Sequence, residues 1–258
     1  MTTGYVEARC TVPSSVTLSA SNGGGGPTSV TVTAGNYYMI DLASHLQTVL
    51  NAQRPGSGGA TWTVSISTGD GGTGRVTISM SSGTFSITWT TTELGTILGH
   101  TTITGETSIT GTNAAHGIFI PNCPLSVDTD PRIAPVLTDL RETRSPTGVI
   151  FSVVGNKEYR HQRLRWSHVI RERTWDVSAV NPSWKRFLMN CQLGQGHDWF
   201  TPSSYVRIVD QTGDYIGNTD SVTTWQMMGV TATEPRKVSE QWTGLWSIEI
   251  PGLTADGG

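Results

Sequence analysis

Charged residues are scarce in this sequence. They make up 14% of its 258 residues, and the formal net charge is −3, whereas roughly 25% of the residues of a typical soluble domain are charged. A protein that binds nucleic acid through its phosphates needs a positively charged surface, so the composition argues against nucleic acid as the main partner. The 9 tryptophans, 6 tyrosines and 5 phenylalanines exclude extensive disorder, because disordered segments have few aromatic residues.

Cysteine and long apolar runs are scarce as well. The three cysteines, Cys10, Cys123 and Cys191, are far apart and form no CxxC pair. They are therefore expected to be buried thiols in a reducing compartment and not a disulfide framework. No stretch approaches 18 consecutive apolar residues, the length typical of a membrane-spanning helix, and residues 1–7 lack the apolar segment of a signal peptide. The sequence predicts no transmembrane span, no secretion signal and folding in a cytoplasm.

Glycine is abundant at 30 residues, and serine and threonine occur throughout the chain. Short strands joined by tight turns use these residues. Alternating or continuous apolar residues predict strands at 12–20, 29–33, 61–67, 75–80, 85–89, 149–154, 160–170, 205–209, 223–230, 236–240 and 244–250. The predicted fold class is mainly β (α+β), with about three short helices.

The helices are predicted from their apolar periodicity and from residues that start and stop helices. They are expected at 41–53, 90–98 and 182–193. Asp41 and Asn181 are the expected N-caps of the first and third helices, and Pro182 follows Asn181 as the expected first helical residue. Gly99 is expected to end the second helix in the left-handed conformation.

The composition changes near residue 120. Residues 1–120 contain 3 basic and 5 acidic residues, and residues 121–258 contain the other 14 basic and 15 acidic residues together with seven of the nine tryptophans. The change predicts two domains: a β-rich α+β module with two short helices at 1–120, and an Arg/Trp-rich β-barrel or sandwich domain with the helix 182–193 at 121–258. Prolines between residues 121 and 146 predict a linker with extended pieces.

Patterns that would support catalysis or cofactor binding are weak. The glycines of residues 69–76 have the spacing of a phosphate loop, but Arg75 and Val76 replace the lysine and the hydroxyl residue, and a hairpin is expected there. His161 and His168 fall on opposite faces of one predicted strand and cannot share a metal ion. The sequence predicts a protein that is not an enzyme, with no catalytic residue, cofactor or metal site.

The densest chemical pattern lies at residues 160–175, which contain five arginines and two tryptophans. Both residue types are enriched at interface hot spots, because they bring large area and directional bonding. Three interpretations stay open: a strand with one solvated face and one core face, a subunit interface, and contact with nucleic acid, which Glu158 and Glu172 disfavour. The candidate interface residues are Arg160, Arg163, Arg165, Trp166, Arg171, Arg173 and Trp175.

The second half resembles small tail and baseplate proteins of tailed bacteriophages. The resemblance rests on the arginine-rich segment 159–173, the helix with Trp184 and Phe187, the glycine turn at 194–200 and the closing strand 245–252. The first half is similar to a module of phage virion proteins. That pattern consists of Asn36-Tyr37-Tyr38, a helix with Leu46 and Leu50, two hairpin strands, Phe85-Ser86-Ile87-Thr88-Trp89 and a Leu98-Gly99 turn.

The resemblance implies a β-barrel with one flanking helix and a non-enzymatic function in the assembly of a tailed phage particle. The expected protein is a ring-forming homo-oligomer at the distal tail or baseplate, located in the virion after assembly in the host cytoplasm, with itself and other virion proteins as partners. Alternatives are a carbohydrate- or receptor-binding module of the virion, a head decoration or head–tail joint protein, and a particle-associated hydrolase.

Overall fold

The fold is that of a computed structural model of the chain. The structure describes residues 4–12, 15–22, 26–53, 59–69, 71–90, 92–123, 126–127, 136–137, 141–144, 150–153, 158–174, 176, 178, 180–192, 205–210, 212–213, 225–227, 236–237 and 246–256. These residues are mostly strands in antiparallel sheets, with three α-helices, so the mainly β (α+β) fold class is confirmed. They form no closed barrel.

The elements of the first half precede residue 120. They are β1 (Tyr5–Val12), β2 (Val16–Asn22), β3 (Thr28–Val32), β4 (Gly35–Tyr38), α1 (Met39–Gln53), β5 (Trp62–Ile66), β6 (Val76–Met80), β7 (Phe85–Trp89), α2 (Thr92–Ile97), β8 (Ile103–Glu106), β9 (Ser108–Thr110) and β10 (Ile118–Phe119). Gly99 follows α2 with a φ of +76° and ends it, as predicted.

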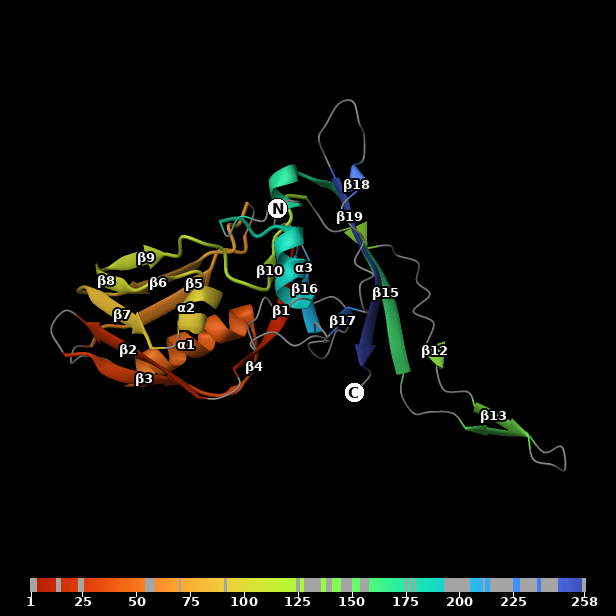
Figure 1. Cartoon of the computed structure of the whole chain (residues 1–258), viewed down its shortest axis with the longest axis horizontal. Helices are drawn as coiled ribbons and strands as arrows, with labels where there is room; N and C mark the ends of the chain where they lie inside the picture. Colours follow the sequence, from red (N-terminus) through yellow and green to blue (C-terminus); the bar gives the residue numbers. More distant parts are fainter. Residues whose placement is uncertain are drawn as a thin grey trace.

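The elements of the second half follow residue 120. They are β11 (Ser126–Val127), β12 (Val136–Leu137), β13 (Arg141–Arg144), β14 (Ile150–Val153), β15 (Glu158–Val169), the 3-10 helix η1 (Arg171–Arg173), α3 (Trp184–Gln192), β16 (Tyr205–Val209), β17 (Trp225–Met227), β18 (Arg236–Lys237) and β19 (Trp246–Asp256). The longest strand pair is β15 with β19 (Figure 1).

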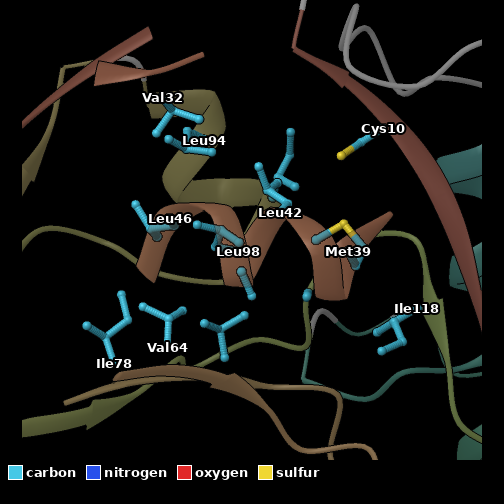
Figure 2. Close-up of a cluster of buried hydrophobic side chains, with 14 of the residues drawn as sticks. Cys10, Val32, Met39, Leu42, Leu46, Val64, Ile78, Leu94, Leu98 and Ile118 are labelled. Carbon is cyan, nitrogen blue, oxygen red and sulfur yellow. The ribbon is translucent and has the colours of Figure 1, made fainter. Parts of the chain in front are cut away.

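Two small sheets and α1 form the body of the first half. Within the described residues, one sheet has the strand order β3-β2-β7-β8 and the other has the order β5-β6-β9. The chain passes from β8 to β9 through Thr107, so one turn connects the two sheets. Figure 2 shows Leu42 and Leu46 of α1 in the core with Leu94, Leu98 and Val64.

Polar side chains of α1 cover the outer edge of β5. The Asn51 side chain accepts a hydrogen bond from the Trp62 backbone N–H (2.8 Å) and donates one to the Trp62 carbonyl (2.9 Å). The Gln47 side chain accepts one from the Val64 N–H (2.8 Å). These side-chain amides make the backbone hydrogen bonds that a neighbouring strand would make, and this protects the edge of β5 from pairing with another chain.

The outer edge of β3 is covered in the same way by the other flank of α1. Gln53 accepts a hydrogen bond from the Thr31 N–H (3.1 Å) and donates one to the Thr31 carbonyl (3.3 Å), and His45 Nε2 accepts one from the Thr33 N–H (3.3 Å). The helix therefore lies between the two sheets and satisfies an edge of each.

A larger sheet joins the two halves of the sequence. Among the described residues it contains ten strands, with β10-β1-β16-β17-β19-β15-β11 as its main path. The first part of β1 pairs with β16, and its second part pairs with β4. Strands from before and after residue 120 thus share one sheet; the division into two domains stays a prediction.

Two expected helix starts are wrong. Helix α1 begins at Met39, two residues before Asp41, so Asp41 lies in its first turn and is not the N-cap. Helix α3 begins at Trp184, and Ser183 is its N-cap, since Ser183 Oγ accepts a hydrogen bond from the Arg186 N–H (3.3 Å). Gly194, expected to end this helix, lies outside the described residues.

Strand β15 departs from simple alternation at its end. The alternation of residues 160–170 predicts Trp166 and Ile170 on the same face of the strand, but Trp166 and Val169 are buried and Ile170 is 37% exposed. The pairing register with β19 shifts between Trp166 and Val169. A shift of this kind is a β-bulge, which turns the following residues to the other face.

Candidate functional site

Trp166, expected at an interface, lies in the core of the chain. It is 1% exposed, and its ring packs edge-on against Phe119 with centroids 5.5 Å apart. Trp184 stacks with Phe187 (5.4 Å) and contacts Phe119 edge-on (5.0 Å). These four rings are called the aromatic junction here, because Phe119 belongs to the first half and the others to the second. A side chain so buried offers no area to a second chain, which corrects the expectation for Trp166.

Arg173, another expected interface residue, contacts the first half of its own chain. Its Nη2 donates a hydrogen bond to the Gly72 carbonyl (3.0 Å), and burial lowers the pKa of its guanidinium. Gly72 belongs to the glycine-rich turn between β5 and β6. This turn therefore receives a cation through a carbonyl oxygen, the opposite of the anion binding of a phosphate loop.

For the other candidate interface residues, the structure describes one side chain, that of Arg171. Arg171 is exposed on η1. Arg160, Arg163 and Arg165 lie on β15, which pairs with β19, but their side chains are outside the described part of the chain. Trp175 also lies outside the described residues.

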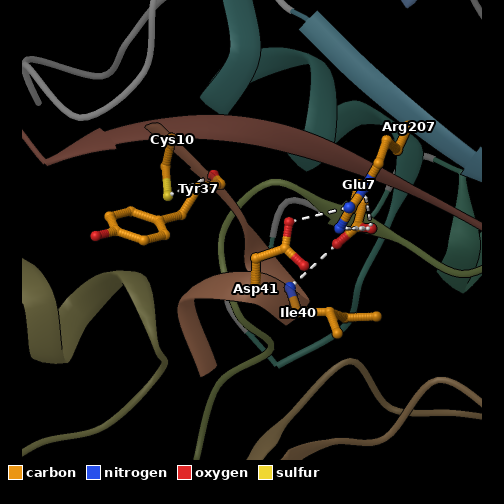
Figure 3. A network of polar contacts seen from close by, with 6 residues as sticks. All are labelled: Glu7, Cys10, Tyr37, Ile40, Asp41 and Arg207. Atoms are coloured by element: carbon orange, nitrogen blue, oxygen red, sulfur yellow. Dashed lines mark hydrogen bonds and ion pairs between the residues drawn. The ribbon is translucent and has the colours of Figure 1, made fainter. Parts of the chain in front are cut away.

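A second cluster, which the sequence did not predict, joins β1, α1 and β16. Arg207 Nη2 lies 2.7 Å from Glu7 Oε1, and Arg207 Nη1 lies 2.9 Å from Asp41 Oδ2 (Figure 3). The Arg207 guanidinium carbon is also 4.1 Å from the centroid of the Tyr38 ring. We call Glu7, Tyr38, Asp41 and Arg207 the charged junction. It is built by residues up to 200 positions apart in sequence.

Glu7 has two roles in the charged junction. Its Oε1 also accepts a hydrogen bond from Arg207 Nε (2.9 Å), and its Oε2 accepts one from the Ile40 N–H at the start of α1 (3.1 Å). A carboxylate from a distant strand therefore satisfies an N–H of the first helical turn, the task that was expected of Asp41. Glu7 is completely buried, and burial raises the pKa of its carboxyl, an effect that Arg207 opposes.

A third contact between the halves lies beside the aromatic junction. Arg186 Nη2 of α3 is 3.0 Å from Nε2 of the buried His116. Asp176, whose charge also acts on Arg186, accepts hydrogen bonds from the Ser178 N–H (2.8 Å) and from Asn181 Nδ2 (2.7 Å), and these bonds lower the pKa of its carboxyl. The Asp-x-Ser pattern of an Asx turn was the one available sequence signal for this loop.

Three arginines of the second half, Arg173, Arg186 and Arg207, thus each meet an acceptor in the first half. The arrangement holds segments of one chain together. Within the described ranges, no group of three His, Cys, Asp or Glu side chains could hold a metal ion. The same ranges contain no helix that is long and apolar enough to cross a membrane.

Comparison of the chain with family models, with curated proteins and with solved structures finds no match.

Proposed function

We propose that this chain is a non-enzymatic structural protein of a tailed bacteriophage particle, a ring-forming component of the distal tail or baseplate. The observation that supports it best is the hairpin of β13 and β14. These strands form a separate two-stranded sheet, with Arg141 paired to Val153 and Arg144 paired to Ile150. The hairpin lies at the end of the molecule away from α1 (Figure 1).

A two-stranded hairpin on its own is marginally stable in water. Its strands also carry backbone N–H and C=O groups on their outer edges, which pair readily with another chain. Among the described strands, none pairs with β13 or β14 from outside. A neighbouring copy in a ring would supply the missing contacts, since head-to-tail contacts between identical subunits close into rings.

The buried charges support a structural role. The ion pair of Glu7 and Arg207 joins two strands of the same chain. Arg173 and Arg186 likewise form hydrogen bonds with residues of their own chain. The sequence resemblance of residues 159–252 to small tail and baseplate proteins supplies the kind of particle.

The test compares three forms of the full chain by mass photometry and negative-stain microscopy. Wild type is expected to form rings. A variant with residues 141–153 replaced by a short Gly/Ser linker is expected to stay monomeric with an unchanged circular dichroism spectrum. The matched control carries the same linker inserted into the exposed turn at Ser81–Gly83, and should still form rings. A wild-type protein that stays monomeric at every concentration and is absent from purified particles would overturn the proposal.

A further inference from the structure

Two buried histidines of the described chain stand at the two ends of the segment that carries β8 and β9. His100 is 6% exposed and His116 is 4% exposed. Both are tied to α2 through the backbone: the His100 N–H bonds to the Gly95 carbonyl (2.8 Å) and the His116 N–H to the Ile97 carbonyl (2.8 Å). Their side chains face in different directions, His100 into the first half and His116 towards α3.

The contact of His116 requires a neutral imidazole. A guanidinium has only donors, so Arg186 Nη2 donates and His116 Nε2 accepts. A proton on Nε2 would remove the acceptor and place a second cation against Arg186. The Asp176 carboxylate has a favourable electrostatic interaction with Arg186. The same carboxylate also accepts hydrogen bonds from Ser178 and Asn181.

Burial favours the neutral form of His100. Its Nε2 lies 2.9 Å from the Val76 carbonyl, which fixes the proton on Nε2 because a carbonyl can only accept. Burial lowers the pKa of His100, an effect that the hydrogen bond to the Val76 carbonyl opposes. With the folded pKa below the unfolded one, the stability from neutral His100 is present above about pH 6.5 and is lost as the pH falls.

The charged junction responds in the opposite sense. Burial raises the pKa of Glu7, so protonation of Glu7 favours the folded arrangement over one in which water reaches this carboxyl. Asp41 is a second acidic partner of Arg207, 2.9 Å from its Nη1. Mild acid is therefore expected to weaken the Arg186–His116 contact and to leave the contacts of Arg207 in place.

We propose that the fold contains a pH-sensitive device: mild acid protonates His116 and His100 and weakens the docking of α3 and of the β8–β9 segment on the body, while β16 stays paired with β1. The charge changes only at the two imidazoles, and the element that shifts between two states, docked and loosened, is the helix α3. The device does not depend on the proposed function.

Hydrogen exchange read by mass spectrometry tests the proposal on the full chain at about pH 7.5 and about pH 5. After correction for the intrinsic rate, amides of α3 and of residues 103–110 should exchange at least about tenfold faster at the lower pH, the change that one pKa unit of coupling produces. Amides of β1 and β16 should not change. Unchanged exchange in α3, or equal acceleration in β1, overturns the proposal.

Variants identify the histidines responsible. His116→Gln keeps an oxygen that can accept from Arg186, and His100→Gln keeps an N–H for the Val76 carbonyl, but neither amide titrates. Each should reduce the acid response, and the double variant should remove it. His45→Gln, at a partly exposed site against Tyr37, is the matched control and should keep the full response. An undiminished response in the double variant contradicts the proposal.

An NMR titration of the wild-type imidazoles covers the case in which a variant does not fold. The His116 ring should be neutral at about pH 7.5, and its protonation midpoint should coincide with the midpoint of α3 exchange. A His116 ring that is already protonated at neutral pH, or that titrates without faster exchange in α3, overturns the proposal.

Discussion

The charged junction and the aromatic junction connect the same two halves of the chain by different physical means. At the charged junction, Arg207 meets Glu7 and Asp41 within 2.9 Å, and every contact has a fixed direction. At the aromatic junction, rings 5.0 to 6.4 Å apart bury large apolar faces with loose demands on geometry. The charged junction therefore specifies how the strands are positioned, and the aromatic junction contributes buried apolar surface.

The two kinds of contact contribute differently to stability. A buried ion pair gains attraction but loses hydration, so its net contribution compared with an apolar pair is small. Buried aromatic side chains remove about 150 to 250 Å² each from water and gain further from edge-to-face packing. We therefore expect the charged junction to matter most when one partner is lost and the other is left buried, and the aromatic junction to matter in proportion to the area removed.

The largest effect is expected for Arg207→Met, which leaves the Glu7 carboxylate buried without its partner. We expect the free energy of unfolding to fall by about 3 to 5 kcal/mol, measured by urea denaturation at neutral pH. The double variant Glu7→Leu/Arg207→Met leaves no buried unpaired ion at that position and should be more stable than Arg207→Met. Equal stability of the two variants would contradict the view that the unpaired charge is the cause.

A somewhat smaller loss is expected for Phe119→Ala at the aromatic junction. Phe119 contacts Trp166, Trp184 and Phe187, and truncation of a buried phenylalanine lowers the free energy of unfolding by about 3 kcal/mol. Phe119→Leu, the control that keeps a larger apolar side chain than alanine, should lose less stability than Phe119→Ala. Both losses should be independent of salt. A loss for Phe119→Ala within 0.5 kcal/mol (about the range of a surface substitution) would show that the rings do not hold the halves together.

Local features of the fold could be predicted from the sequence because they depend on near neighbours in the chain. The apolar face of α1 repeats within 15 residues, and its members Leu42, Leu46, Val49 and Leu50 are all buried. Gly99 ended α2 as expected, because a left-handed residue is a property of one position. Alternation likewise located the hairpin strands β5 and β6.

Contacts between distant residues could not be predicted. The first turn of α1 begins two residues before Asp41, because Glu7 accepts the Ile40 N–H from a separate strand. Nothing in the local sequence of Arg207 indicates that its partner is Glu7, and a local pattern does not reveal the bulge that buries Val169.

Residue type alone did not show which residues of 160–175 contact the rest of their own chain. Tryptophan is enriched both in cores and at interfaces, and only the packing against Phe119 shows that Trp166 belongs to the core. Arginine was likewise expected to face a partner subunit. For Arg173 the partner is the glycine-rich turn of its own chain, a contact across 101 residues.

The smallest effect is expected at alkaline pH and concerns Cys10, a buried residue close to the charged junction. Cys10 lies on β1 three residues after Glu7, and its thiol donates to the Tyr37 carbonyl (3.1 Å, Figure 3). Burial raises the pKa of this thiol from 9.0 to about 12. The unfolded chain therefore ionises first, and the stability contributed by the buried thiol is complete below pH 9 and is lost as the pH rises towards 12.

At about pH 10 this amounts to a loss of roughly 1.4 kcal/mol relative to neutral pH, one pKa unit of linkage. Tyrosines and lysines titrate in the same range, so the measurement is the difference between wild type and Cys10→Ala in urea denaturation at a series of pH values. The variant should lose less stability between about pH 9 and pH 11, whatever its stability at neutral pH. Parallel curves for the two proteins would mean that water reaches the thiol. In that case β1 would also be packed less tightly around Glu7 than the charged junction requires, because Cys10 and Glu7 lie three residues apart on the same strand.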